Sequence, residues 1–151
     1  MKRILFVSAI GLVIGITGES SRITGQGAGP ATKSTAQLLP ADSVKWLTAR
    51  PGQDSSVLWG DPRSGAYGRF NRFAAGFEDR PHFHTRDLRV VIIAGTMIIK
   101  VASDPSMELG PGSYALVPGG SPHTHSCKAG AACMLFVEQD GPNDTTAIEP
   151  K

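Results

Sequence analysis

Turn-forming residues interrupt the chain at short intervals and leave no room for a long helix after residue 38. Among 151 residues, 18 are glycine and 11 are proline, whereas only 19% are charged. Short runs of β-branched and aromatic residues separate the turns, and no long stretch has the 3.6-residue period of a helix. The runs that predict strands are 43–48, 55–59, 67–75, 88–93, 96–101, 113–117, 123–127 and 132–138. This pattern predicts eight or more antiparallel strands, arranged as a jelly-roll barrel or an open sandwich.

The N-terminal residues have the composition of an export signal. Lys2 and Arg3 precede an apolar run, which small and polar residues follow. The run has about 13 residues, fewer than the roughly 20 that span a bilayer as a helix. We expect a signal peptide over 1–18, a flexible leader over 19–37 and a single domain over 38–148. The protein would then be periplasmic or secreted, with no stable membrane span. A buried N-terminal helix or an uncleaved anchor is the alternative.

Charge and cysteine content limit the partners and the compartment. Removal of residues 1–18 leaves 13 basic and 13 acidic residues, so the mature chain has no net charge with histidine neutral. No basic patch stands out, which argues against nucleic acid as a partner. An oxidising compartment permits a disulfide between Cys127 and Cys133, across a predicted hairpin. A pair of free, buried thiols is the other expectation.

All four histidines fall in two H-x-H pairs. His82 and His84 form the first pair, and His123 and His125 form the second. Residues i and i+2 of a strand point to the same face, so each pair can present two imidazoles to one space. If the two strands are neighbours, four nitrogen ligands converge, and imidazole suits Zn, Cu, Fe and Ni. The alternative is two unrelated surface pairs.

The spacing around these pairs resembles the two motifs of the cupin superfamily. Gly76, five residues, the first pair and later Gly95 resemble the first motif. Gly112, five residues, Pro118-Gly119-Gly120, two residues and His123 resemble the second. The W-x-G-D-P-like segment at 58–62 is similar to one subgroup, the small exported single-domain bacterial cupins. The resemblance implies a cupin-type double-stranded β-helix, a jelly-roll barrel with a metal inside. We therefore expect His82, His84 and His123 as metal ligands, with His125 as a further ligand or a residue of the pocket wall.

Two positions depart from the cupin pattern, and both lie close to the expected metal. Leu88 stands where the first motif carries a glutamate, and Cys127 stands where the second carries an asparagine. Asp87 is one residue away from the glutamate position, so only a β-bulge would bring it to the metal. Without the glutamate, water, a substrate anion, His125 or a free Cys127 thiolate would complete the ligand set. Outer support for a histidine would come from Glu78 or Asp79, although loop carboxylates usually face water.

The resemblance implies a protein that binds or transforms a small molecule at the barrel mouth. One divalent ion is expected, with Fe, Mn, Zn, Cu and Ni all open. An enzyme of this kind would be a metal-dependent oxygenase or isomerase, and the alternative is a non-catalytic binding or sensing cupin without the full metal site. Arg86 and Arg89 are candidates to bind an acidic substrate, although a solvated strand face is the favoured interpretation. Apolar residues on both faces of strand 88–93 make a homodimer one expected assembly.

Overall fold

The computed structural model describes residues 35–149, and nearly all of them lie in strands or tight connections. The expected signal peptide and most of the expected leader lie outside these residues. Within 35–149 there is one short 3-10 helix, η1 (Ala41–Ser43), and no helix long and apolar enough to cross a membrane. The strands are β1 (Leu47–Arg50), β2 (Gln53–Gly60), β3 (Tyr67–Phe73), β4 (His82–Phe83), β5 (Leu88–Ala94), β6 (Met97–Val101), β7 (Met107–Leu109), β8 (Tyr114–Val117), β9 (His123–Cys127), β10 (Cys133–Gln139) and β11 (Thr146–Ala147).

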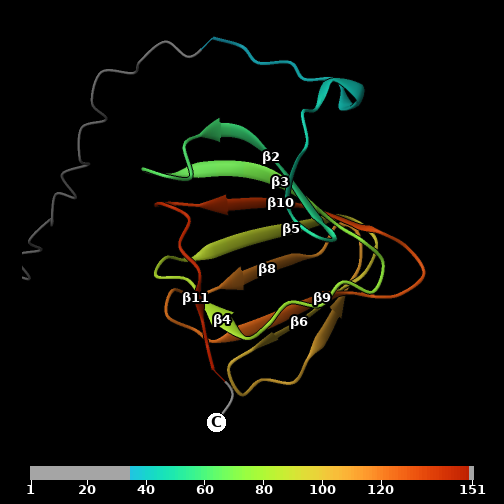
Figure 1. Ribbon diagram of the computed structural model, residues 1–151, viewed down its shortest axis with the longest axis vertical. Coiled ribbons are helices and arrows are strands. Elements are labelled where there is room, and N and C mark those ends of the chain that lie inside the picture. Colours follow the sequence, from blue (N-terminus) through green and yellow to red (C-terminus); the bar gives the residue numbers. More distant parts are fainter. Residues whose placement is uncertain (1–34, 150–151) are drawn as a thin grey trace, which may run out of the picture. The chain divides into compact units, whose positions relative to one another are not determined.

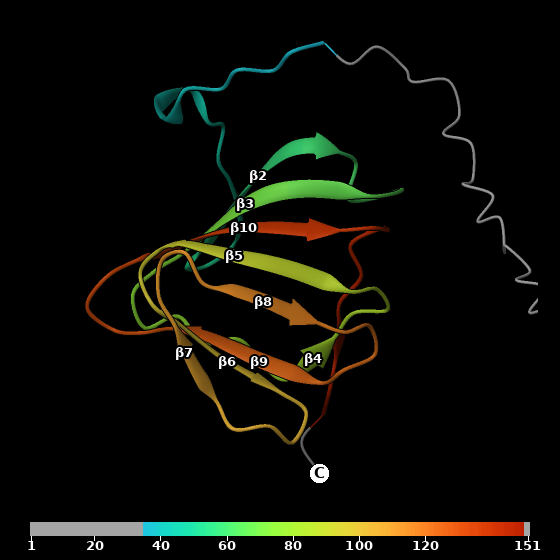
Figure 2. The ribbon, with the colours of Figure 1, turned by 180° about the vertical axis from the view of Figure 1, so that it is seen from behind.

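The strands form two antiparallel sheets, which Figures 1 and 2 show from opposite sides. One sheet has the order β1-β2-β3-β10-β5-β8 and the other the order β11-β4-β9-β6-β7. The expected all-β jelly-roll barrel is confirmed, in preference to the alternative of an open sandwich. The first expected strand begins late: residues 41–43 form η1 and the strand itself is β1.

Strand β10 lies at the centre of the six-stranded sheet. It pairs with β3 on one side and β5 on the other. Its side chains alternate strictly, so that Cys133, Leu135, Val137 and Gln139 are buried while the residues between them are partly exposed. The apolar members of this inner face join the core. The buried core cluster is Phe73, Val90, Ile92, Met97, Ile99, Cys127, Cys133, Leu135 and Val137.

The motif glycines occupy turns that favour glycine. Gly112 and Gly120 have φ values of 84° and 77°, in the left-handed region that L side chains rarely adopt. This confirms the tight turns expected at both positions. Each turn returns the chain into a strand that faces the interior, and Gly120 N–H also donates to His84 O at 2.7 Å. The second motif thereby holds the connection that follows the first histidine pair.

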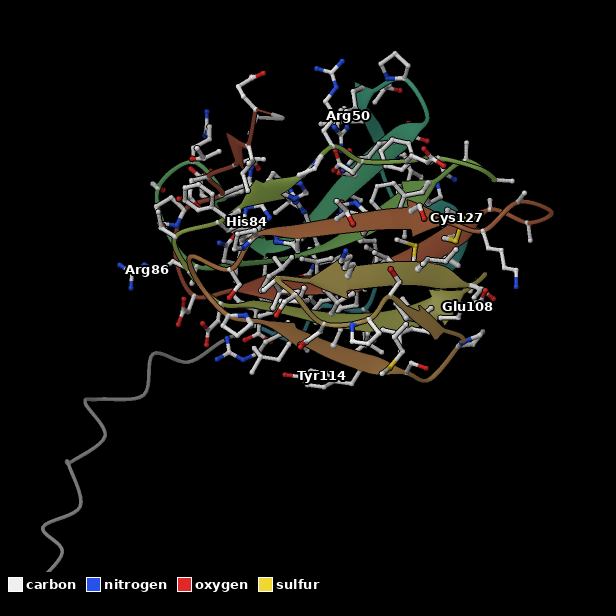
Figure 3. The ribbon with its side chains drawn as sticks, turned by 90° about the horizontal axis from the view of Figure 1, so that it is seen from below. Arg50, His84, Arg86, Glu108, Tyr114 and Cys127 are labelled. Atoms are coloured by element: carbon white, nitrogen blue, oxygen red, sulfur yellow. A yellow bond between two sulfur atoms is a disulfide. The ribbon has the colours of Figure 1, made fainter. Side chains whose placement is uncertain are left out.

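A disulfide joins the two sheets. It lies at the end of the barrel away from the turn that follows His84. Cys127 ends β9 and Cys133 begins β10, their Cα atoms are 5.8 Å apart, and their sulfurs are bonded. Figure 3 shows the disulfide beside the label of Cys127. Of the two expectations for these cysteines, the disulfide is therefore the one observed. The expectation that a free Cys127 thiolate would compensate for the missing glutamate is wrong, because the Cys127 sulfur is bonded to that of Cys133.

Candidate metal centre

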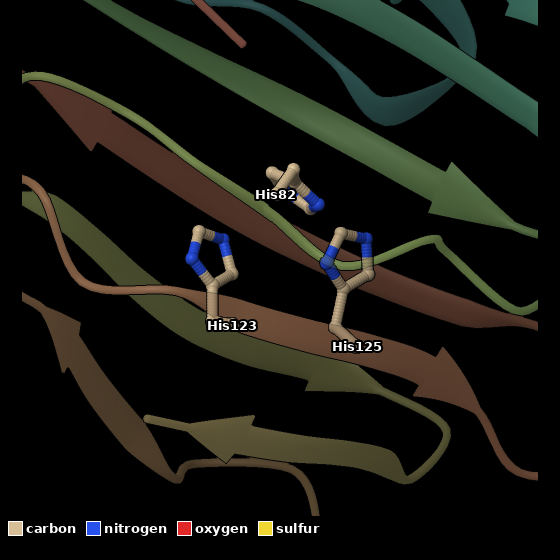
Figure 4. Close-up of side chains that lie close together, drawn as sticks. All are labelled: His82, His123 and His125. Carbon is tan, nitrogen blue, oxygen red and sulfur yellow. The ribbon is translucent and has the colours of Figure 1, made fainter. Parts of the chain in front are cut away.

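Two neighbouring strands bring the histidine pairs together. His82 begins β4 and His123 begins β9, and the two residues are direct partners in the antiparallel register. His125 lies two residues further along β9, on the same face as His123. His84 follows the end of β4. The expectation that the two pairs lie on neighbouring strands is confirmed, and Figure 4 shows three of the rings entering one space from both strands.

The structure groups the histidines differently from the motif. The ligand atoms of His82, His123 and His125 all lie within 4.8 Å of one another, and these three could hold a metal ion. His84 stands beside them, with its ring centroid 5.1 Å from that of His82 and 5.2 Å from that of His123. His125, expected as a substitute, thus belongs to the tightest group. Ligation by all four histidines remains a prediction.

Backbone carbonyls orient three of the rings. The Nδ1 atom of His82 lies 2.7 Å from Arg80 O, and that of His123 lies 3.1 Å from Ser121 O. The Nδ1 atom of His84 contacts the carbonyl of Asp144. A carbonyl oxygen can only accept a hydrogen bond, so we assign the hydrogen to Nδ1 in each ring. The lone pair is then on Nε2, which is the arrangement that metal-binding histidines use.

Burial favours the neutral form of three histidines, His84, His123 and His125. It lowers the pKa of His123 to about 4, and it also lowers the pKa values of His84 and His125 below the ordinary range. Within residues 35–149, the buried Nε2 atoms of His123 and His125 have no hydrogen-bond partner. Leaving such an atom unsatisfied costs about 1–3 kcal/mol. A cation that accepts the Nε2 lone pair of His123 would remove its share of this penalty, and the grouping of His123 with His82 and His125 therefore fits a metal ion.

Asp79 is the carboxylate nearest to the histidines. Its side chain is 8% exposed, and its Oδ2 lies 3.4 Å from His125 Nε2 and 4.0 Å from His82 Nδ1. Both terminal nitrogens of the Arg50 guanidinium donate to the Asp79 carboxylate. Burial acts to raise the pKa of Asp79, but the hydrogen bonds from Arg50 and the proximity of His125 outweigh it and lower that pKa. The carboxylate is therefore ionised and aimed at His125.

This arrangement partly follows the sequence expectations for the loop before His82. Asp79 does have the place expected of an outer partner, whereas Glu78 is exposed. The usual orientation of a loop carboxylate toward water does not hold for Asp79. Its backbone N–H also donates to His125 O at 2.9 Å, which fixes the loop on β9. The role of Arg50 was not foreseen, because it lies 29 residues away from Asp79 in the sequence.

The two replaced motif positions have other roles. Leu88 lines the cavity and packs against the core, so the glutamate is replaced by apolar surface. Asp87 does not substitute for it: its Oδ1 accepts a hydrogen bond from Gly119 N–H at 2.9 Å, and it is absent from the cavity wall. The expectation that a β-bulge could bring Asp87 to the metal is therefore wrong.

A cavity of about 310 Å³ is lined by residues of both sheets. All four histidines line it, together with Phe73 and with residues of β2 and β3. Its volume is at the lower end of the range for small-molecule sites. The residues suggested earlier for an acidic substrate are elsewhere: Arg86 is exposed, and Arg89 lies 3.9 Å from the carboxylate of Asp87. Tyr114 is 57% exposed, and Figure 3 shows it and Arg86 at the outside of the barrel.

Comparison with known proteins identifies the fold and the family. Residues 29–147 match a family model described as a domain of unknown function, DUF4437. No curated protein matches the chain.

KdgF from Halomonas sp. is similar in structure, with a TM-score of 0.60, 17% identity, and coverage of 70% of this chain and 94% of that one. The polyketide cyclase RemF from Streptomyces resistomycificus gives a TM-score of 0.65 and 19% identity, over 78% of this chain and 88% of that one. An RmlC-like cupin from Shewanella frigidimarina gives 0.60 and 16%, over 72% and 93%. The chain is thus a cupin by fold, and it belongs to the DUF4437 family.

Proposed function

We propose that this protein binds one divalent transition-metal ion through His82, His123 and His125, with His84 as a fourth ligand or a cavity residue, and uses it to bind or transform a small molecule. The observation that carries the proposal is the pair of buried Nε2 atoms without hydrogen-bond partners. Their rings come from one strand that faces His82 directly. Fe, Mn, Zn, Cu and Ni all suit imidazole ligands.

The chemistry follows from the charge of the ligands. Neutral histidines leave a divalent ion with its full double charge, and Leu88 supplies no compensating carboxylate. Such an ion would act as a Lewis acid with positions free for a small molecule. Asp79, ionised and held by Arg50, lies 3.4 Å from His125 Nε2 and would partly offset the charge of the ion. An anionic ligand in the cavity would complete the balance.

The enzyme hypothesis is a metal-dependent oxygenase or isomerase. The alternative is a cupin that binds or senses a small molecule without turnover. One observation favours the alternative: the only carboxylate lining the described cavity is Asp79, which Arg50 already engages. Beyond the histidines, the described cavity wall therefore offers little to act as a general base.

Elemental analysis of the mature protein, after exposure to each of the five metals and dialysis, tests the proposal. We expect close to one equivalent of one metal in wild type. Equally low metal in wild type and in a His82→Ala, His123→Ala double variant would refute it. Aerobic incubation with small acids and thiols then separates the two hypotheses, because turnover supports the enzyme and stabilisation without turnover supports the binding module.

Two further parts of the proposal concern assembly and location. Val91, Ile93, Tyr114 and Leu116 on the outer faces of β5 and β8 are 38–57% exposed, which supports a homodimer through this face. The Cys127–Cys133 disulfide supports export to an oxidising compartment. Sedimentation analysis and fractionation of the producing cells, with the N-terminus of the mature protein determined, test these two parts.

A further inference from the structure

Arg69 is a half-buried arginine without an acidic partner among the described residues. It lies in the middle of β3 and lines the cavity. Its Nε is buried and has no hydrogen-bond partner, and no salt bridge to Arg69 occurs anywhere in the part of the chain that the structure describes. Four other arginines each lie within 4.0 Å of an aspartate: Arg50, Arg63, Arg72 and Arg89.

The surroundings of Arg69 do not compensate its charge. The guanidinium lies 5.2 Å from the centroid of the Tyr67 ring, and this is its one recorded contact of a kind that favours a cation. Burial lowers the pKa of Arg69, although a guanidinium stays protonated in proteins. An unpaired buried charge destabilises the folded chain. The described residues therefore leave this cation at the cavity wall without an acidic partner.

The donors beside Arg69 fit a carboxylate. Asn71 is two residues further along β3 and also lines the cavity. Its Oδ1 accepts a hydrogen bond from Ser55 Oγ at 2.7 Å, which leaves its NH₂ group to donate. A planar guanidinium fork matches the two oxygens of a carboxylate, and an amide can add a third hydrogen bond. A phosphate, with more charge and more acceptor oxygens, would need further cations in this wall.

Arg69 and all four histidines line the same cavity. The cavity volume equals that of about ten water molecules in the liquid, at ~30 Å³ each. Apolar residues such as Leu88, Val90 and Leu135 line the space between. A small organic acid can therefore touch both walls of the same cavity.

We propose that Arg69 binds the carboxylate group of a small organic acid in this cavity, with the Asn71 amide as a second donor. The proposal deepens the function proposed above and rests on it for the metal alone. It assigns the substrate or ligand class of the site: monocarboxylic or dicarboxylic acids of a few carbon atoms. Arg69 is the specificity-determining residue, and its place near the histidines puts the remainder of the acid beside the metal ligands.

The test compares wild type with Arg69→Met, which keeps an unbranched apolar side chain and removes the charge. Arg89→Met is the matched control, because it removes the same group from an arginine on the outer face of β5. The probes are pyruvate, malonate and benzoate, each against its amide, with metal-free and zinc-exposed protein. Calorimetry gives the affinities, thermal unfolding gives the stabilities, and elemental analysis gives the bound zinc.

We expect wild type and Arg89→Met to prefer at least one acid over its amide by tenfold or more, and Arg69→Met to lose that preference. Metal-free Arg69→Met should also unfold at a higher temperature than metal-free wild type, since an uncompensated buried charge is gone. An unchanged preference in Arg69→Met would overturn the proposal. So would lower stability of that variant, the absence of any preference in wild type, or an equal response to inorganic phosphate. Because metal-free protein is included, loss of the acid preference in Arg69→Met upholds the role of Arg69 even if no zinc binds. The metal proposal is decided separately, by the elemental analysis with all five metals.

Discussion

The two walls of the cavity have opposite chemistry. The wall formed by β4 and β9 presents imidazoles, and the buried Nε2 atoms of His123 and His125 have no hydrogen-bond partner among the described residues. The wall formed by β2 and β3 presents hydrogen-bond donors, with Arg69 as an unpaired cation. The first wall suits a cation and the second suits an anion. The comparison teaches that neither wall is satisfied by the chain alone, and that a metal together with an acid would satisfy both.

Of the changes to the two walls, loss of a histidine should have the largest effect, and that effect is on metal affinity. We expect His123→Ala to weaken metal binding by more than ~100-fold, beyond the 10–100-fold typical for an outer partner of a ligand. Thr124→Ala is the matched control, since that side chain points to the opposite face of β9. Competition with a chromogenic chelator measures both affinities. Equal affinities in the two variants would remove His123 from the ligand set.

Acid should destabilise the metal-free protein through the histidine wall. The pKa of His123 is lowered from 6.5 to about 4, so the unfolded chain binds more protons than the folded chain between these values. Stability is then complete above pH 6.5 and falls by about 3 kcal/mol as the pH decreases to 4. His84 and His125 add in the same direction.

Urea unfolding of metal-free protein at pH 7 and pH 4.5 measures this loss. His123→Ala should show a smaller difference between the two pH values than wild type does. The donor wall should contribute nothing to it, because the Arg69 guanidinium keeps its charge throughout. A pH-independent stability over this interval would contradict the neutral state assigned to the histidines.

The disulfide should matter to the spacing of the two walls, because it links β9 of one sheet to β10 of the other. Replacing both cysteines by serine should lower the free energy of unfolding by about 2 kcal/mol, as the loop-closure model gives for so short a loop. Reduced wild type is the control for the effect of the serine side chains. If oxidised and reduced wild type unfold at the same urea concentration, the link carries no stability.

The smallest expected effect concerns Asp79. Asp79→Asn removes the charge beside His125 while keeping the size of the side chain, and we expect about tenfold weaker metal binding. The ring contacts of His125 with Phe73 and Phe77 limit the loss, since they hold the imidazole in place. Asp54→Asn, which breaks an exposed pair with Arg72, should leave the affinity unchanged. A similar change in both variants would mean that net charge alone is responsible.

The fold and the histidine wall could be predicted because their signals are local. Glycine and proline marked the turns, and the i, i+2 spacing of each histidine pair fixed a shared face. Strands β4, β7 and β11 have two or three residues each and show no period, so they were missed. The strand expected over 43–48 begins only at Leu47, because Ser43 ends η1 and residues 44–46 are not in a strand.

The donor wall could not be predicted in the same way. Arg69 has no motif around it, and a sequence does not reveal that an arginine lacks a partner. Arg50 and Asp79 meet only because β1 and the loop before β4 converge in space. The outcome for Asp87 and Cys127 also depended on long-range contacts, with Gly119 in one case and Cys133 in the other.

The central place of β10 has a consequence for the order of folding. Before residues 133–139 are available, the six-stranded sheet exists only as two separate pieces, β1-β2-β3 and β5-β8. Each piece would present an unpaired strand edge, at β3 and at β5, and such edges invite association with other chains. Joining strands so distant in sequence is slow. Synthesis of a late segment should therefore be the event that commits the chain to its native sheet, and partly made chains should be the form most prone to aggregate.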